Sequence, residues 1–150
     1  MHIGRRLFIN AGLALAALAA LPRTLLAAAW PEKAFNYTTA SEAMNELLGS
    51  NQPVPSDEIS LKAPEIAENG AVVPLKIKTT LKNVQSISIV VEKNPRPLAA
   101  TVEILPGTLA EFSNRIKMRE TSNVMVVVKT DSGVFSTSKL VKVTIGGCGG

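Results

Sequence analysis

Apolar and polar residues alternate along most of the chain between residues 57 and 145. Residues 73–81 give the clearest case, because Val73, Leu75 and Ile77 fall on one face and the intervening lysines on the other. The alternation recurs at residues 57–62, at Ile87, Ile89 and Val91, at Ala100, Val102 and Ile104, at Ile116 and Met118, at Val124, Val126 and Val128, and at Val141, Val143 and Ile145. A period of two predicts half-buried strands, seven or so in all.

Turn signals separate these strands at short intervals. They are Asn94-Pro95-Arg96-Pro97, a rigid connection that lacks two backbone donors, Pro106-Gly107, and the hairpin signal Asp131-Ser132-Gly133. Short strands at this spacing predict an all-β fold, an immunoglobulin-like antiparallel β-sandwich. Because the chain has a single cysteine, the inter-sheet disulfide of antibody domains is excluded.

One short helix precedes the strands. Thr39-Ala40-Ser41-Glu42 has the form of a capping box, and it begins an amphipathic helix that Gly49 ends. A loop with Pro53 and Pro55 follows the helix. We therefore expect a short N-terminal helix joined to the sandwich.

The first 29 residues have the order of an export signal. Arg5-Arg6 precedes an apolar stretch, and Ala27 and Ala29 offer a small-residue cleavage site before Trp30. The apolar stretch is interrupted at Pro22-Arg23, so an anchor or a helix of the fold is the weaker interpretation. We expect residues 1–29 to be a twin-arginine signal peptide that directs the chain to the periplasm, without stable membrane insertion.

Composition limits the remaining chain to one domain, residues 30–145. Apolar residues make up 46% of the sequence and aromatic residues only 4%, so the core is built from aliphatic side chains. The net charge is +4, but three of the 16 basic residues precede residue 30, which leaves 13 against 12 acidic residues. That near balance excludes a nucleic-acid partner as a working hypothesis.

Cys148 is the only cysteine, and His2 in the predicted signal is the only histidine. The exported chain therefore has no Cys–His or Ser–His pair for catalysis and lacks the usual ligands of a zinc or copper site. A single thiol in an oxidising compartment indicates a reactive group or intermolecular pairing. We expect no metal, no cofactor and no enzymatic activity of its own.

The thiol lies in a glycine frame at the end of the last strand. Residues 146–150 read Gly146-Gly147-Cys148-Gly149-Gly150 and predict a flexible arm, which spans roughly 17 Å when fully extended. Such an arm fits a narrow cleft of another protein. An ordinary cysteine has a pKa near 8.5 and the arm carries no cation, so the receiving protein has to activate the thiol.

Other interpretations of the arm remain open. It is a frayed tail with an incidental cysteine, a carrier that uses a C-terminal thiocarboxylate, or the crosslink of a secreted immunoglobulin-like module that dimerises through Cys148. Prenylation is excluded because only two residues follow the cysteine. Replacing Cys148 separates the two kinds of carrier, since a thiocarboxylate carrier keeps its sulfur.

The C-terminal sequence resembles that of the SoxY family, the sulfur-carrying subunits of the SoxYZ complex in bacterial thiosulfate oxidation. The resemblance is carried by residues 143–150, by residues 66–74 (Ile-Ala-Glu-Asn-Gly-Ala-Val-Val-Pro) and by residues 93–98 (Lys-Asn-Pro-Arg-Pro-Leu). It implies that Cys148 holds thiosulfate and its products covalently, with the four glycines as the arm. It implies SoxZ as the heterodimer partner and transient docking with SoxAX, SoxB and, where present, SoxCD.

Two smaller features have a structural and a functional interpretation. Ala67-Glu68-Asn69-Gly70 is read as a tight turn in preference to a docking feature. Arg96, Arg115, Lys117 and Arg119 could guide anionic cargo on the arm, but a solvated strand face is the favoured account of the last three.

Overall fold

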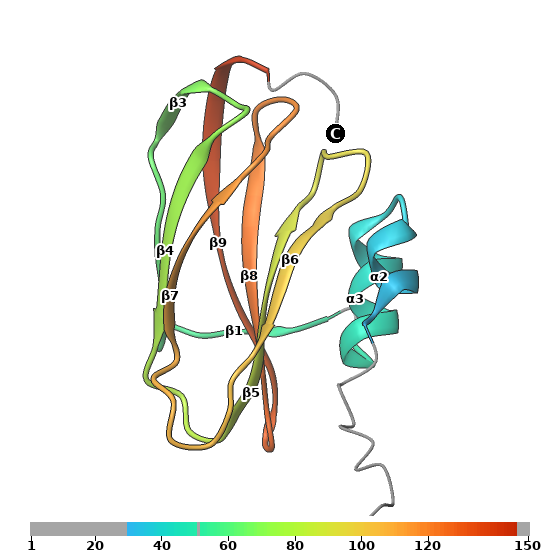
Figure 1. The fold of residues 1–150 in the computed structure, drawn as a ribbon, viewed down its shortest axis with the longest axis vertical. Coiled ribbons are helices and arrows are strands. Elements are labelled where there is room, and N and C mark those ends of the chain that lie inside the picture. Colours follow the sequence, from blue (N-terminus) through green and yellow to red (C-terminus); the bar gives the residue numbers. More distant parts are fainter. Residues whose placement is uncertain (1–29, 51, 147–150) are drawn as a thin grey trace, which may run out of the picture. The chain divides into compact units, whose positions relative to one another are not determined.

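The structure is a computed structural model that describes residues 30–50 and 52–146. These residues form two short helices and nine strands (Figure 1). The elements are α2 (Glu32–Asn36), α3 (Ala40–Leu48), β1 (Val54–Pro55), β2 (Ile59–Lys62), β3 (Ile66–Asn69), β4 (Val73–Thr79), β5 (Val84–Val91), β6 (Leu98–Glu103), β7 (Glu111–Ile116), β8 (Ser122–Thr130) and β9 (Gly133–Ile145). None of the described helices is long and apolar enough to cross a membrane.

The strands form two sheets, as the sequence predicts for an all-β fold. The large sheet has the order β1-β9-β8-β5-β6, with β3 also paired to β9, and the small sheet has the order β2-β4-β7. Five strand pairs are antiparallel. The pairs β1–β9 and β3–β9 are parallel, which the antiparallel prediction did not include. β1 pairs with Phe135 and Ser136, which also pair with β8, whereas β3 pairs with residues 142–145, beyond the last β8 pair.

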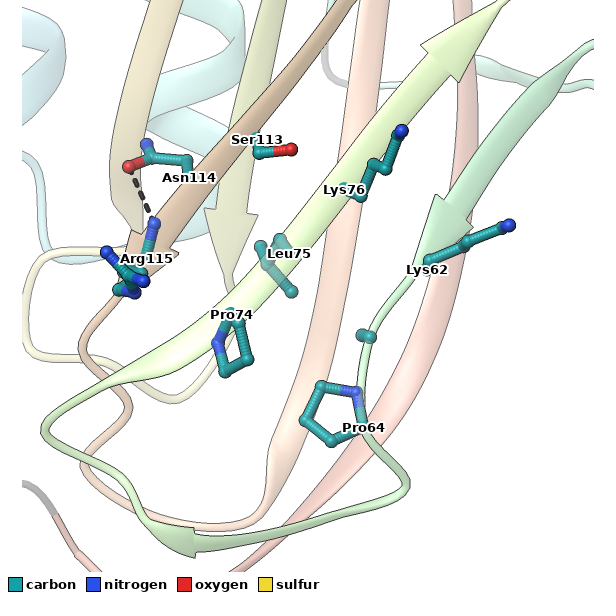
Figure 2. Close-up of a pocket in the computed structure, with 9 residues that line it drawn as sticks. Lys62, Pro64, Pro74, Leu75, Lys76, Ser113, Asn114 and Arg115 are labelled. Atoms are coloured by element: carbon teal, nitrogen blue, oxygen red, sulfur yellow. Dashed lines mark hydrogen bonds between the residues drawn. The ribbon is translucent and has the colours of Figure 1, made fainter.

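The core fills the space between the two sheets. Val73, Leu75 and Ile77 of β4 are at most 3% exposed, and they share one cluster with the inward residues of β5 and β8. Inward positions of β8 include Val124, Val126 and Val128. The period-two alternation therefore reports the burial of β4 and β8 correctly. The outward positions of β4 include Lys76, which lies on the solvent face of the small sheet (Figure 2).

The helices cover part of the outer face of the large sheet (Figure 1). Met44 and Leu48 of α3 pack in one apolar cluster with Val90 of β5 and Val127 of β8. The backbone N–H of Glu42 donates to Oγ1 of Thr39 over 3.3 Å, and Gly49 ends α3. The predicted N-cap Thr39 and the predicted end of the helix at Gly49 are confirmed, and Glu42 bonds the hydroxyl of Thr39.

Three local predictions need correction. The turn predicted at residues 67–70 begins later, because β3 continues to Asn69 by pairing with β9. The loop expected around Pro53 and Pro55 contains β1, a two-residue strand on the β9 edge. The strand predicted through Ile116 and Met118 ends at Ile116, so Met118 lies beyond β7. In addition, the sequence did not predict α2, because five residues are too few to show a helical period.

Candidate functional site

The candidate site is the arm root, which we define as residues 143–146. It joins β9 to the predicted carrier arm. Gly147, Cys148, Gly149 and Gly150 lie outside the described residues, as do Arg5 and Arg6 of the predicted signal. Gly146 is described and exposed. The described residues that position the predicted arm are therefore those of its root and their bonding partners.

At the arm root, β9 continues past the end of β8. The ladder between the two strands ends where Ser122 pairs with Val141. Further along β9, Val143 and Ile145 pair instead with Ala67 and Asn69 of β3. Thr144 adds a side-chain bond, in which its Oγ1 donates to the carbonyl oxygen of Glu68 over 3.0 Å. The last strand is thus held up to its final residue.

Gly70 connects the arm root to the segment after β7. Its buried backbone N–H donates to the carbonyl oxygen of Ile145 over 2.8 Å, and its own carbonyl accepts from the N–H of Met118 over 2.7 Å. The side chain of Asn69 stabilises the turn, since Oδ1 accepts from the N–H of Ala71 over 2.8 Å. The first internal motif of the sequence therefore supports the base of the arm.

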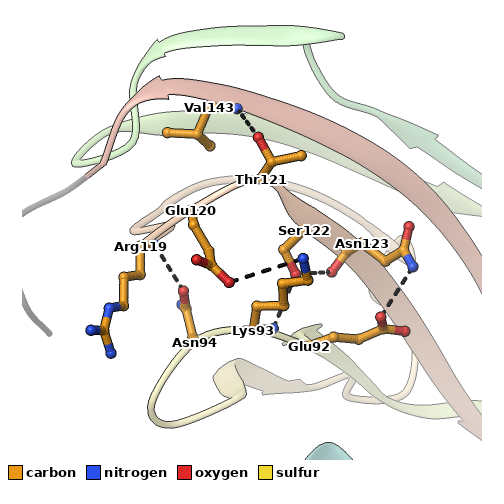
Figure 3. Close-up of polar contacts among 9 residues, drawn as sticks. All are labelled: Glu92, Lys93, Asn94, Arg119, Glu120, Thr121, Ser122, Asn123 and Val143. Atoms are coloured by element: carbon orange, nitrogen blue, oxygen red, sulfur yellow. Dashed lines mark hydrogen bonds and ion pairs between the residues drawn. The ribbon is translucent and has the colours of Figure 1, made fainter.

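Asn94 holds the same segment from another loop (Figure 3). Its Nδ2 donates to the carbonyl oxygen of Lys117 over 2.8 Å, and its Oδ1 accepts from the N–H of Arg119 over 3.0 Å. Oγ1 of Thr121 accepts from the N–H of Val143 over 2.9 Å. The second internal motif, residues 93–98, is thus brought to the arm root as well.

Ser122, the first residue of β8, is bonded to the loop that carries Asn94 (Figure 3). Its Oγ accepts from the N–H of Lys93 over 3.0 Å and donates to the carbonyl oxygen of Asn123 over 3.1 Å. Because Ser122 is only 1% exposed, these bonds are shielded from water. The residues that position the arm root therefore come from segments far apart in the sequence, and none was predicted in that role.

Gly146 lies against the backbone of the segment that Asn94 holds. A Cβ at this position would meet the carbonyl oxygen of Arg119 at a distance that real side chains do not adopt. Glycine permits this close approach because it has no Cβ. The first arm glycine therefore has a packing role in addition to the freedom expected of the arm.

The predicted basic residues lie on the surface near the arm root. Arg115, Lys117 and Arg119 are exposed and alternate with buried Ile116 and Met118, but only Arg115 lies in a strand, β7. Arg96 is exposed too, in the connection between β5 and β6. Within residues 30–50 and 52–146, no cluster of three or more metal-ligating side chains occurs.

Comparison with known proteins identifies what this geometry resembles. The family model described as sulfur oxidation protein SoxY matches residues 44–148, a range that ends at Cys148. The structure of the sulfur carrier protein SoxY from Chlorobium limicola f thiosulfatophilum matches with 39% sequence identity and a TM-score of 0.62, covering 69% of this chain and 94% of that one.

A second similar structure is that of an engineered protein. It has 12% identity and a TM-score of 0.41, and the match covers 58% of this chain and 20% of that one. This likeness is too slight to bear on fold or function. Among curated proteins, none matches the chain.

Proposed function

The chain belongs to the SoxY family of sulfur carrier proteins, and from this membership we propose that it carries thiosulfate and its oxidation products on Cys148 in the periplasm. The observation that supports this assignment is the arm root. Backbone bonds hold Ile145 in place directly before the sequence Gly-Gly-Cys-Gly-Gly. A rigid body that ends in a short thiol-bearing arm is suited to presenting one sulfur atom to several enzymes.

The proposed chemistry begins with oxidative loading. The thiolate of Cys148 and the outer sulfur of thiosulfate form a sulfur–sulfur bond, and the two electrons released pass to a c-type cytochrome pair of the SoxAX kind. A hydrolase of the SoxB kind then adds water, releases sulfate and two protons, and leaves a persulfide on the cysteine. Where an enzyme of the SoxCD kind is present, it oxidises that outer sulfur to a sulfonate with three water molecules, which releases six protons and six electrons to the enzyme's electron acceptor.

The carrier itself supplies position and no catalysis in this proposal. Backbone, hydroxyl and amide groups of the described residues hold the arm root in place. Among these groups, none is a nucleophile placed beside a base. Activation of the thiol then comes from the enzyme that receives the arm.

Covalent loading of Cys148 is tested by the intact mass of the protein with time, in the presence of thiosulfate and the loading cytochrome. We expect a thiosulfate adduct on the parent chain and none on Cys148→Ser, because a hydroxyl forms no bond of the disulfide type. Adduct formation on Cys148→Ser would show that the sulfur is carried elsewhere.

The glycines of the arm are tested in the same assay. Gly147→Val should leave thermal stability almost unchanged while it slows loading, because a β-branched residue widens the arm and restricts its backbone. Gly146→Ala is the matched variant at the arm root, where even one methyl group meets the carbonyl oxygen of Arg119. If Gly147→Val loads at the parent rate, the proposal of a narrow receiving cleft is wrong.

We propose that the chain reaches the periplasm through the twin-arginine pathway. Replacing Arg5 and Arg6 with lysine should leave unprocessed protein in the cytoplasm, as followed by fractionation and immunoblotting. Normal export of the double variant would contradict the proposal.

We also propose a heterodimer with a SoxZ subunit. The mature chain expressed alone should self-associate or aggregate, and co-expression with SoxZ should give a stable one-to-one complex in sedimentation. A chain that stays monomeric with and without SoxZ would contradict this assembly.

A further inference from the structure

The outer face of the small sheet is strongly basic. The outward positions of β2, β4 and β7 carry Lys62, Lys76, Lys78 and Arg115, which we call the basic face. Glu111 of β7 is the one acidic residue on these three strands. The exported chain is close to neutral, so positive charge is concentrated on this face and not spread evenly over the molecule.

The charge arrangement on this face costs stability. Lys62 and Lys76 are directly opposite each other in the β2–β4 ladder, and like charges in that position destabilise a sheet. Glu111 offsets only part of this, with Oε1 2.8 Å from Nζ of Lys76 and Oε2 3.8 Å from Nζ of Lys78. Among the described residues, Lys62 and Arg115 have no ion-pair partner. A local arrangement that opposes stability is typical of a surface kept for function.

The hydrogen bond from Lys76 favours the ionised form of the Glu111 carboxyl. It holds the pKa of this carboxyl below its ordinary value, with the charge of Lys76 acting in the same direction. Glu111 therefore stays ionised at neutral pH, and the basic face still carries four positive charges against one negative charge.

A hollow of about 670 Å³ opens on this face (Figure 2). Lys62, Lys76 and Arg115 line it, together with Pro64 and Pro74, whose rings restrict the backbone there. Lys62 and Lys76 extend side by side from neighbouring strands (Figure 2). The hollow is a recess in an exposed sheet, and its cations stand in solvent.

The basic face also leads to the arm root. Beyond Arg115, the exposed side chains of Lys117 and Arg119 continue the positive charge along the same segment. The backbone carbonyl of Arg119 is the group that lies against Gly146. A protein bound to the basic face would therefore sit next to the point where the arm leaves the sandwich.

We propose that the basic face is a docking site for an acidic surface on the enzymes that receive the arm. On each enzyme, this acidic surface lies beside the cleft that the arm enters. This inference rests on the proposed carrier function. A protein occupant fits better than a small free anion, because the cations are exposed and spread over three strands. A site built for a small anion brings its donors together in a buried pocket.

Electrostatic docking of this kind suits a carrier that must bind and leave several enzymes. Complementary charge raises the rate of encounter and fixes orientation more than it adds affinity. The basic face would then orient the sandwich, so that the arm enters the cleft after encounter.

The test compares two triple variants of the full mature heterodimer in a Cys148→Ser background, which prevents covalent trapping. K62Q/K76Q/R115Q removes three charges from the basic face. K33Q/K82Q/K142Q removes three exposed charges elsewhere, and Lys142 lies close to the arm root in β9. Binding to the purified loading cytochrome and to the purified hydrolase is measured by biolayer interferometry at low and at physiological ionic strength.

We expect K62Q/K76Q/R115Q to associate at least about tenfold more slowly at low ionic strength and to depend less on salt. The control should stay within about twofold of the parent. Equal binding by both triple variants, salt-independent binding of the parent, or absence of parent binding would each overturn the proposal. The proposal would also be overturned if the parent bound thiosulfate alone tightly and only K62Q/K76Q/R115Q lost that binding. A small anion would then be the occupant of the basic face.

The carrier function has a separate test, in which the same proteins keep Cys148. Their intact mass is measured after incubation with thiosulfate and a saturating concentration of the loading cytochrome. Binding that depends on the basic face, without any adduct on Cys148, supports docking and rejects the carrier function. Adducts that form equally fast at every enzyme concentration in the parent and in K62Q/K76Q/R115Q support the carrier function and reject docking.

Discussion

The outer faces of the two sheets differ sharply. On the large sheet, Val90 and Val127 point outward and are fully buried, because helix α3 covers them with Met44 and Leu48. On the small sheet, the outward positions of β4 include Lys76, which stays in solvent. One outer face is covered by the chain itself, and the other carries charge that the chain leaves largely uncompensated.

This difference separates stability from function in the two faces. Burial of aliphatic side chains under α3 stabilises the fold, since removal of apolar surface from water is the main favourable contribution to folding. The basic face contributes little to stability, and one of its cross-strand pairs opposes it. Substitutions on the two faces should therefore affect different measurements.

The largest effect is expected under the helix. Met44→Ala removes a side chain that is 6% exposed and leaves a cavity against the large sheet, so the free energy of unfolding should fall by about 2–5 kcal/mol. Ser113→Ala on the outward side of β7 should change it by less than about 0.5 kcal/mol. Urea unfolding monitored by circular dichroism measures both. Similar losses for the two variants would remove the distinction between the faces.

A smaller effect, with opposite signs in two assays, is expected from Lys62→Glu. The new carboxylate would stand opposite Lys76 and replace a like-charge pair with an attractive one, which raises the free energy of unfolding by about 0.2–1 kcal/mol. The same variant should bind the acidic partner more weakly than Lys62→Gln. A loss in both assays would indicate that Lys62 supports the sheet.

The smallest effect is expected from Glu111. Its pKa is lower in the folded chain, so its stabilising effect is present at neutral pH and is lost as the pH falls through the lowered pKa. The difference in unfolding free energy between the parent and Glu111→Gln should therefore be small at neutral pH and disappear in acid. Glu111→Gln should also bind the acidic partner more tightly, and weaker binding would contradict the role of the basic face.

The sequence predicts the covered parts of the molecule well. Alternation in residues 73–81 identifies the buried face of β4, and Thr39 with Gly49 marks both ends of α3. These signals are local, because side-chain periodicity and capping depend on neighbouring residues. The local signal Asp131-Ser132-Gly133 likewise identified the hairpin turn between β8 and β9.

The arm root and the basic face were harder to predict, because both depend on pairing between distant segments. Thr144 and Glu68 meet across 76 residues of sequence, and Lys62 faces Lys76 only once β2 and β4 are in register. Asn69-Gly70 and Asn94-Pro95 read as ordinary turns in the sequence. Only the fold shows that both turns support the same end of β9.

The length of β9 has a mechanical consequence for a chain that is pulled by its end. Under the proposed function, an enzyme that draws on the arm would apply force along the axis of β9, a strand of 13 residues. Hydrogen bonds to β8 on one side and to β1 and β3 on the other lie across that axis, so they are loaded together in shear and are not opened one after another. Tension on the cysteine would therefore be shared by both sides of the large sheet, and the sandwich would resist unravelling under the proposed engagement of the arm.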